Sequence, residues 1–264
     1  MDPWDPNIMT IGKIFSGDGT VNSVDFHRSG NYLVVGNSNN ILYLIDCISG
    51  QLRQKIYARS HGLRQVKYTH HEACVICSSD KKSDDIRYLS LLDNRYLRYF
   101  HGHGNRVSSI SMCPNDDNFL SSSLDNTVRL WDLSSPNSIA RLELPYNLDS
   151  PYAVYDYTGV IFGVQCRNSG TKSNHLKLYD VRMYDKGPFI DVSPSASQIA
   201  FAIDSSMSSY VPAHPQRALS SQWESFEFSA DGSNILVRTK SDMILVRFTC
   251  FIGNRQLSCE YLIE

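Results

Sequence analysis

The sequence predicts an all-β fold, a β-propeller made of repeats of roughly 43 residues, from three observations. Gly102-His103 stands 28 residues ahead of Trp131-Asp132, a spacing typical of one WD repeat. Between these dipeptides lie three strand-like runs, RVSSISM, NFLSSSL and TVRLWDL, separated by turn-forming residues. The ends of the first strands recur after 42, 44 and 43 residues, and they fall at Phe26, Tyr68, Met112 and Tyr155, with one more at Phe228.

The repeat at 101–145 carries four polar side chains whose spacing predicts a buried network. These are His103 before the first strand, Ser121 in the second, Asp125 at the next turn and Trp131 in the third. The indole can donate to the hydroxyl, the hydroxyl to one imidazole nitrogen, and the other nitrogen to the carboxylate, which satisfies every polar group. A hydrolytic triad is the alternative interpretation, but the hydroxyl is then already used by the indole. We therefore expect a structural tetrad and no catalytic residue, metal or cofactor.

Composition and charge narrow the class of protein. A chain of 264 residues with 42% hydrophobic and 20% charged residues is typical of a globular protein, here one all-β domain. The net charge of −2 provides no overall attraction to nucleic acid or anionic lipid, so neither is expected as a direct partner. Seven scattered cysteines favour reduced thiols inside the cell, and the sequence contains no apolar run of roughly 20 residues.

We expect five blades in a single domain over residues 1–264, and their predicted ranges are 19–58, 59–100, 101–145, 146–192 and 219–264. A stretch rich in Ser, Pro and Ala at 191–221 predicts an insertion loop. Ile45, Tyr179 and Phe248 stand where the third blade has tryptophan, which indicates apolar packing there. A strand-like segment at 8–16 could supply an outer strand that closes a ring, but the sequence shows no last blade for it. We therefore interpret the chain as a C-terminally shortened propeller.

Three stretches resemble one particular WD-repeat family, namely residues 85–107, SLDNTVRLWDL (Ser123 to Leu133) and KLYDVRMYDKGPF (Lys177 to Phe189). The family contains the animal WD repeat-containing protein 82 and the yeast Swd-two protein, and the resemblance extends over approximately residues 12–248. It implies a non-catalytic nuclear propeller of seven blades, of which about five are visible in this sequence.

The resemblance also implies partners. One is the N-terminal region of a histone lysine-four methyltransferase within a COMPASS-type complex, together with the other subunits of that complex. The others are cleavage and polyadenylation or protein phosphatase 1 assemblies, and the C-terminal tail of RNA polymerase II. These partners predict a scaffold that links both kinds of complex to transcription. The alternative is a substrate receptor of a cullin-type ubiquitin ligase, and co-purifying subunits would distinguish the two.

Partner binding is expected on loops at one face of the ring, because blade faces bury their apolar sides against each other. The residue just before a first strand opens onto the narrower face, which makes Arg106 the strongest candidate, and repeat logic adds Asn22, Arg64 and Leu124. A second hypothesis is a basic patch that binds an acidic or phosphorylated peptide, because arginine pairs bidentately with phosphate. That patch comprises Arg95, Arg98, His101 and Arg106, and a solvated blade edge is the favoured interpretation.

Two further clusters have a functional and a structural interpretation. One interpretation of His70, His71, Cys74 and Cys77 is that their side chains bind a zinc ion. Residues three apart on a strand point to opposite faces, however, so the two thiols are not expected to share an ion. One interpretation of Asp84-Asp85 and Asp116-Asp117 is that they are the paired carboxylates that glycoside hydrolases use. Their polar sequence contexts favour turns instead.

Overall fold

A computed structural model describes residues 12–17, 19–79, 81, 83–145, 148–193, 222–232, 234–239, 243–249 and 258–263. It contains five four-stranded antiparallel sheets, and η2 (Tyr184–Lys186) is a 3₁₀ helix. The chain divides into two compact units, Met1–Arg98 and Tyr99–Glu264, which are described separately below. No helix among the described residues has the length and apolarity that a bilayer-crossing segment requires.

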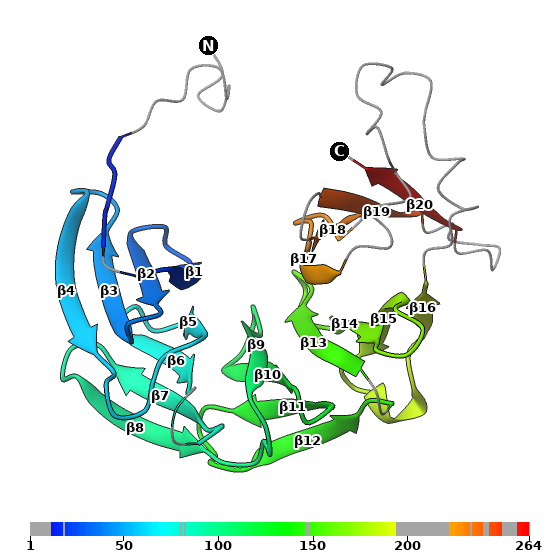
Figure 1. The fold of residues 1–264 in the computed structure, drawn as a ribbon, viewed down its shortest axis with the longest axis horizontal. Helices are drawn as coiled ribbons and strands as arrows, with labels where there is room; N and C mark the ends of the chain where they lie inside the picture. The colour runs from blue at the N-terminus through cyan, green and yellow to red at the C-terminus, as the bar shows by residue number, and fades with distance from the viewer. Residues whose placement is uncertain are drawn as a thin grey trace. The chain divides into compact units, whose positions relative to one another are not determined.

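Unit 1 holds the first two sheets, apart from the last two residues of β8. Each sheet is a blade whose strands follow one another in chain order (Figure 1). Blade 1 consists of β1 (Val21–Phe26), β2 (Tyr32–Asn37), β3 (Ile41–Asp46) and β4 (Gln51–Tyr57). Blade 2 consists of β5 (Val66–Tyr68), β6 (Cys74–Ser78), β7 (Ile86–Ser90) and β8 (Arg95–Phe100).

Unit 2 holds the other three sheets in the same strand order. Blade 3 consists of β9 (Val107–Met112), β10 (Asn118–Ser123), β11 (Thr127–Asp132) and β12 (Ser138–Glu143). Blade 4 consists of β13 (Leu148–Tyr155), β14 (Ile161–Asn168), β15 (Asn174–Asp180) and β16 (Ile190–Val192). Blade 5 consists of β17 (Trp223–Phe228), β18 (Asn234–Thr239), β19 (Met243–Thr249) and β20 (Ser258–Ile263).

The predicted all-β WD-repeat propeller fold is confirmed by these sheets, and each predicted blade range contains one of them. Asp191 and Val192 pair with β15, so these first two residues of the predicted insertion loop belong to a strand. The remainder of that loop, from residue 194 on, lies outside the described residues, as does the first part of the segment 8–16. That the two units form a single domain stays a prediction.

The third-strand position of Trp131 is packed by apolar side chains in blades 1, 3 and 4, as predicted, whereas the side chain of Phe248 in blade 5 lies outside what the structure describes. Trp131 stacks on Phe119 with ring centroids 6.0 Å apart, and in blade 4 Tyr179 stacks on Phe162 at 5.1 Å. Ile45 is buried at the corresponding position of blade 1. These side chains anchor the third strand to the second within each sheet, where burial of one large apolar group stabilises the fold by about 1.5–3 kcal/mol.

Hydroxyl side chains join blade 3 to blade 4 in unit 2. The Ser109 hydroxyl accepts a hydrogen bond from Ala153 N at 2.9 Å and donates to Ala153 O at 3.1 Å. Two residues further along each strand, Tyr155 N donates to the Ser111 hydroxyl at 3.1 Å. The first strand of one blade therefore binds the backbone of the first strand of the next through its side chains.

Unit 1 uses the same arrangement between blades 1 and 2. Val66 N donates to the Ser23 hydroxyl, which donates in turn to Val66 O, both at 3.0 Å. The Asp25 carboxylate accepts from Tyr68 N at 2.8 Å. Buried backbone groups that lack a strand neighbour are satisfied in this way.

Replacing Ser109 with alanine is expected to lower the free energy of unfolding by about 1–2 kcal/mol, because buried Ala153 N–H and C=O groups lose their partner. Urea unfolding followed by circular dichroism measures this change. Ser134→Ala, at an exposed position, serves as the control and is expected to change stability by less than about 0.5 kcal/mol. Equal losses for the two variants would contradict the role assigned to the Ser109 hydroxyl.

The seam between blades 4 and 5 is more apolar. Trp223 and Phe226 pack with Leu176, Leu178 and Val237 in one buried cluster. A polar link also crosses it, in which the Gln165 side-chain amide donates to Trp223 O at 3.0 Å. Adjacent seams in unit 2 thus differ in chemistry.

Candidate protein-binding surface

The four predicted tetrad residues are joined by hydrogen bonds in blade 3. Trp131 Nε1 donates to the Ser121 hydroxyl at 2.8 Å, and the hydroxyl lies 2.6 Å from His103 Nε2. His103 Nδ1 lies 3.0 Å from Asp125 Oδ2. The side chain of His103 is fully buried. These contacts require the His103 tautomer with its proton on Nδ1, because the hydroxyl proton points to Nε2.

Thr127 is a fifth member that the sequence analysis missed. Its hydroxyl donates to Asp125 Oδ1 at 2.7 Å, and Gly104 N donates to Asp125 Oδ2 at 2.9 Å. Burial opposes ionisation of Asp125, but hydrogen bonds from His103, Thr127 and Gly104 outweigh it and hold the pKa of the carboxyl below its ordinary value. The ionised carboxylate fixes the loop that leads into β9.

Ser121 has none of the exposure that a nucleophile needs. Its residue surface is fully buried, and its oxygen is shared between the Trp131 indole and the His103 imidazole. A substrate has no access to this hydroxyl without opening the blade. The geometry favours the structural interpretation of these side chains over the hydrolytic one.

The structure brings Arg106 and Leu124 together at one end of blade 3. Leu124 N donates to Arg106 O at 3.0 Å, which joins the loop before β9 to the loop after β10. The Ser123 hydroxyl donates to Asn105 O at 2.7 Å and braces the same loop. Arg106 is exposed and Leu124 is half-buried. Arg106 and Leu124 are thus neighbours on two loops that hydrogen bonds hold together.

Asn22 and Arg64 belong to unit 1. Asn22 is the extra residue of a β-bulge in β1, between the paired residues Val21 and Ser23. Arg64 is half-buried just before β5, and its N–H donates to Ser78 O at 3.1 Å. Bulges re-aim the side chains beside them, so Asn22 points differently from a regular strand residue.

The repeat position of Arg106 differs from that of Asn22 and Arg64. Asn22 and Arg64 stand four residues before the ends of their first strands, whereas Arg106 stands six before Met112. Ser108 holds the corresponding position in blade 3, and its hydroxyl donates to Pro151 O. The four predicted residues are therefore not equivalent. A backbone hydrogen bond joins Arg106 and Leu124 in unit 2, and Asn22 and Arg64 lie in unit 1.

The remaining candidate residues lie in structural roles. Cys74 and Cys77 are both buried on β6, and burial raises the pKa of Cys77 to about 12. The described residues contain no group of three or more His, Cys, Asp and Glu side chains that could hold a metal ion. Asp116 accepts a hydrogen bond from Asn118 N at 3.1 Å within its turn. Arg95 and His101 are exposed, and Arg98 is half-buried.

A second Ser–His–Asp set lies at the outer side of blade 4, and the sequence analysis did not find it. Ser173 Oγ lies 3.0 Å from His175 Nε2, and His175 Nδ1 lies 3.4 Å from Asp191 Oδ1. Lys177 forms an ion pair with Asp191 at 3.2 Å.

The loop beside this set lacks an oxyanion site. The amides of Gly170 and Thr171 both donate to Asn168 Oδ1, and Lys172 N donates to Asn168 O. Because these three amides already donate within the turn, they are not available to stabilise the oxyanion of a tetrahedral intermediate. The set is best explained as a surface hydrogen-bond network.

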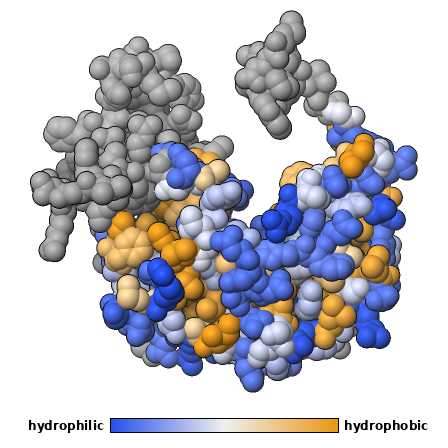
Figure 2. Space-filling model, turned by 180° about the vertical axis from the view of Figure 1, so that it is seen from behind, coloured by the Kyte–Doolittle hydropathy of each residue, from blue (hydrophilic) through white to orange (hydrophobic). Residues whose placement is uncertain are grey.

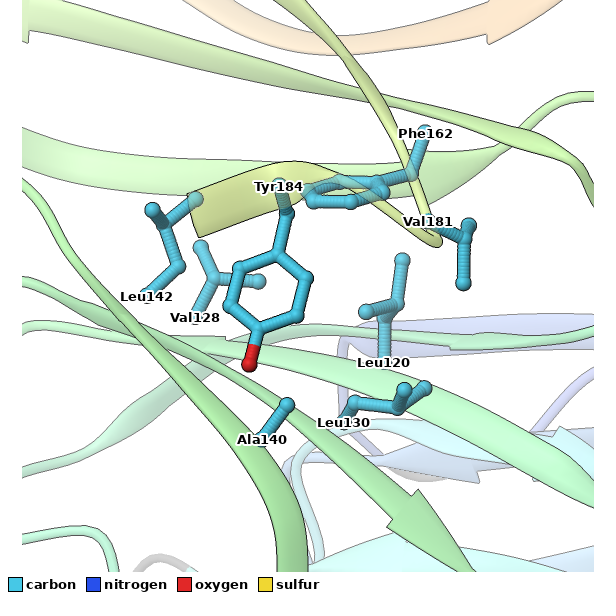
Figure 3. A pocket seen from close by; sticks show the side chains of 8 residues that line it. All are labelled: Leu120, Val128, Leu130, Ala140, Leu142, Phe162, Val181 and Tyr184. Atoms are coloured by element: carbon cyan, nitrogen blue, oxygen red, sulfur yellow. The ribbon is translucent and has the colours of Figure 1, made fainter. Parts of the chain in front are cut away.

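An apolar pocket lies between blades 3 and 4 (Figure 3). Tyr184 of η2 crosses it, with its hydroxyl toward Ala140 of β12, while Phe162 and Val181 come from blade 4. The remaining lining residues are Leu120, Val128, Leu130 and Leu142. The cavity is about 10 Å³, room for about one water molecule, whereas ligand sites enclose about 300–1,000 Å³. It is a packing seam that fixes the loop 181–189.

Unit 2 also exposes apolar side chains. In the face shown in Figure 2, hydrophobic residues gather over this unit, on the left. Large apolar side chains exposed in the described part of unit 2 are Tyr99, Ile139, Tyr157, Val160, Met183, Phe189 and Leu236. Exposed apolar area rimmed by polar residues is typical of surfaces that bind other proteins.

The fold and the motif matches define a WD-repeat β-propeller protein. The family model for "WD domain, G-beta repeat" matches residues 9–46 and 94–132. The sequence is 35% identical to WD repeat-containing protein 82 of Drosophila melanogaster over 89% of this chain and 65% of that protein. It is 35% identical to Set1 complex component swd2 of Schizosaccharomyces pombe over 85% of this chain and 55% of that protein. It is 32% identical to COMPASS component SWD2 of Saccharomyces cerevisiae over 90% of this chain and 63% of that protein.

The chain thus matches the family of WD repeat-containing protein 82 and Swd2, in agreement with the resemblance seen in the sequence. It spans less than two thirds of the length of each of these three relatives. Two of these relatives are named as components of the Set1 complex and of COMPASS.

Proposed function

We propose that this chain is a non-catalytic scaffold subunit of a COMPASS-type histone lysine-four methyltransferase complex, and that it acts in the nucleus. The observation that carries the proposal is the similarity to Set1 and COMPASS components over 85% or more of the chain. The buried state of Ser121 and the lack of oxyanion donors beside Ser173 favour binding over hydrolysis.

The wider set of partners belongs to the same proposal. These are cleavage and polyadenylation or protein phosphatase 1 assemblies, and the C-terminal tail of RNA polymerase II. A propeller suits a shared subunit, because its blades bury their apolar faces and leave many loops for separate partners.

Purification of the tagged 264-residue chain from nuclear extract, followed by mass spectrometry, tests this function. Methyltransferase and COMPASS-type subunits are the expected result. Cullin adaptors in their place would replace the proposal with the ubiquitin ligase alternative. Recovery of chaperones alone would contradict the proposal for this chain.

The surface formed by Arg106 and Leu124 is proposed to contact the methyltransferase. Arg106→Glu combined with Leu124→Asp is expected to lower recovery of the methyltransferase by about tenfold, since both a charge and an apolar contact are lost. Arg182→Glu, at an exposed site in the loop after β15, is the matched control. Unchanged recovery with the double variant would rule out this surface, and Asn22→Ala and Arg64→Glu test unit 1 in the same assay.

A further inference from the structure

A stripe of paired cations and aromatic rings follows the outer strand of blade 1. β4 is the edge strand of its sheet (Figure 1). Three cations on β4 or just after it each lie over a tyrosine ring. The pairs are Arg53 over Tyr32 at 5.0 Å, Lys55 over Tyr43 at 5.5 Å and Arg59 over Tyr57 at 5.0 Å from the ring centroid. We call these six residues the blade 1 stripe.

The three cations and Tyr57 are open to solvent, whereas Tyr32 and Tyr43 are half-buried. Lys55 and Arg59 are exposed, the Arg53 side chain is 54% exposed and Tyr57 is 53% exposed. Arg53 forms a long ion pair of 3.8 Å with Asp46, which is weak at such exposure. A fourth pair, Lys13 over Phe15 at 5.6 Å, lies close to the start of β4, since a Cβ at Gly50 would meet Lys13 Cδ at 3.3 Å.

Basic residues outnumber acidic ones in the sequence around the stripe, although Asp46 pairs with Arg53 and Asp25 pairs with Lys67. From Cys47 to His71 the sequence holds five Lys and Arg residues and no Asp or Glu. The whole chain has 25 basic and 27 acidic residues, so its net charge of −2 conceals this local excess. Local clusters, rather than the net charge, determine the field that a nearby polyanion meets.

We propose that the blade 1 stripe binds single-stranded nucleic acid without sequence preference. Proteins that do so combine cations for the phosphates with aromatic rings on which bases stack. Residues two apart on a strand are separated by about 6.6 Å, close to the step between phosphates in an extended strand, and Lys55 and Tyr57 have this relation. An acidic peptide would use the cations but would gain nothing from the rings. RNA and single-stranded DNA share the required chemistry.

The cation–π pairs also prepare the site for binding. Each ring holds a long flexible side chain near one position before a ligand arrives, which lowers the entropy cost of ordering it on binding. The stripe lies entirely in unit 1 and does not include Arg106 or Leu124. It is therefore independent of the proposed methyltransferase contact.

Fluorescence anisotropy of the whole chain with labelled oligouridylate and oligothymidylate of about 15 nucleotides tests the proposal. Three phosphate contacts predict a slope of about −2 for the logarithm of the affinity against that of the salt concentration. The triple variant Arg53→Glu, Lys55→Glu and Arg59→Glu is expected to lose at least about tenfold in affinity. A stronger signal for the uridylate than for the thymidylate would identify RNA as the preferred source.

The matched control carries the same charge change on blade 4, with Lys172→Glu, Arg182→Glu and Lys186→Glu, and is expected to stay within about twofold of the parent. Tyr57→Ala leaves every charge in place and is expected to weaken oligouridylate binding by about fivefold or more through lost stacking. Melting curves verify that each variant is folded. An equal loss in the control, no effect of Tyr57→Ala, or displacement by polyglutamate at equal charge would each overturn the proposal.

Discussion

Replacing Trp131 with alanine is expected to lower the free energy of unfolding of unit 2 by about 3–5 kcal/mol. The indole is fully buried, stacks on Phe119 and meets Phe100 edge to face at 5.7 Å. Its removal leaves a cavity and also takes away the donor of the hydrogen bond to Ser121. Urea unfolding followed by circular dichroism measures the change.

Trp131→Phe separates the two contributions. Phenylalanine keeps a ring against Phe119 but removes the N–H, so most of the packing is retained. We expect a smaller loss for it than for alanine, with about 1 kcal/mol arising from the missing hydrogen bond. Blade 4 supplies a precedent within this chain, because the single ring of Tyr179 stacks on Phe162 at the corresponding position. Similar losses for alanine and phenylalanine would contradict the packing argument.

Replacing Asp125 with alanine is expected to cost about 3 kcal/mol at neutral pH. The substitution removes the acceptor for His103, Thr127 and Gly104 at once. The buried imidazole then has no partner at Nδ1 except the Thr127 hydroxyl at 3.3 Å. Equilibrium unfolding of both proteins at pH 7 gives this difference.

The same variant predicts the pH dependence. The folded state holds the pKa of Asp125 below its ordinary value of 3.8, and burial is outweighed by the hydrogen bonds from His103, Thr127 and Gly104. The stabilisation is therefore complete above pH 3.8 and is lost as the pH falls below it. The stability difference between the parent and Asp125→Ala should narrow on acidification in that range. A constant difference down to the acid transition would exclude the ionised carboxylate as its source.

The tetrad could be predicted because each member sits at a fixed offset from a turn or a strand end. The Gly-His dipeptide, the Asp125 turn and Trp131 locate three members of the tetrad in the sequence. The antiparallel pairing of β10 with β11 then brings the fourth member, Ser121, to the indole. Thr127 was missed because its role depends on a side-chain contact within the turn.

The exact loop positions could not be predicted in the same way. The residue before a first strand does not mark one position of the repeat, because β5 has three residues and β9 has six. Arg106 and Arg64 are therefore not equivalent, and Ser108 holds the position in blade 3 that corresponds to Arg64. Asp191 meets His175 only because β16 pairs with β15 after an intervening loop. The cation–aromatic pairs of blade 1 were hidden by averaging charge over the whole chain.

The hydroxyl groups between blades have a consequence for hydrogen exchange. The amides of Ala153 and Tyr155 are held by side chains of the neighbouring blade, whereas other amides of β13 face its own partner β14. Their exchange rates therefore measure how often blades 3 and 4 separate, independently of whether either sheet opens. These two amides act as built-in reporters of blade docking, and Ser109→Ala would accelerate exchange at Ala153 while β14 and β15 stayed protected.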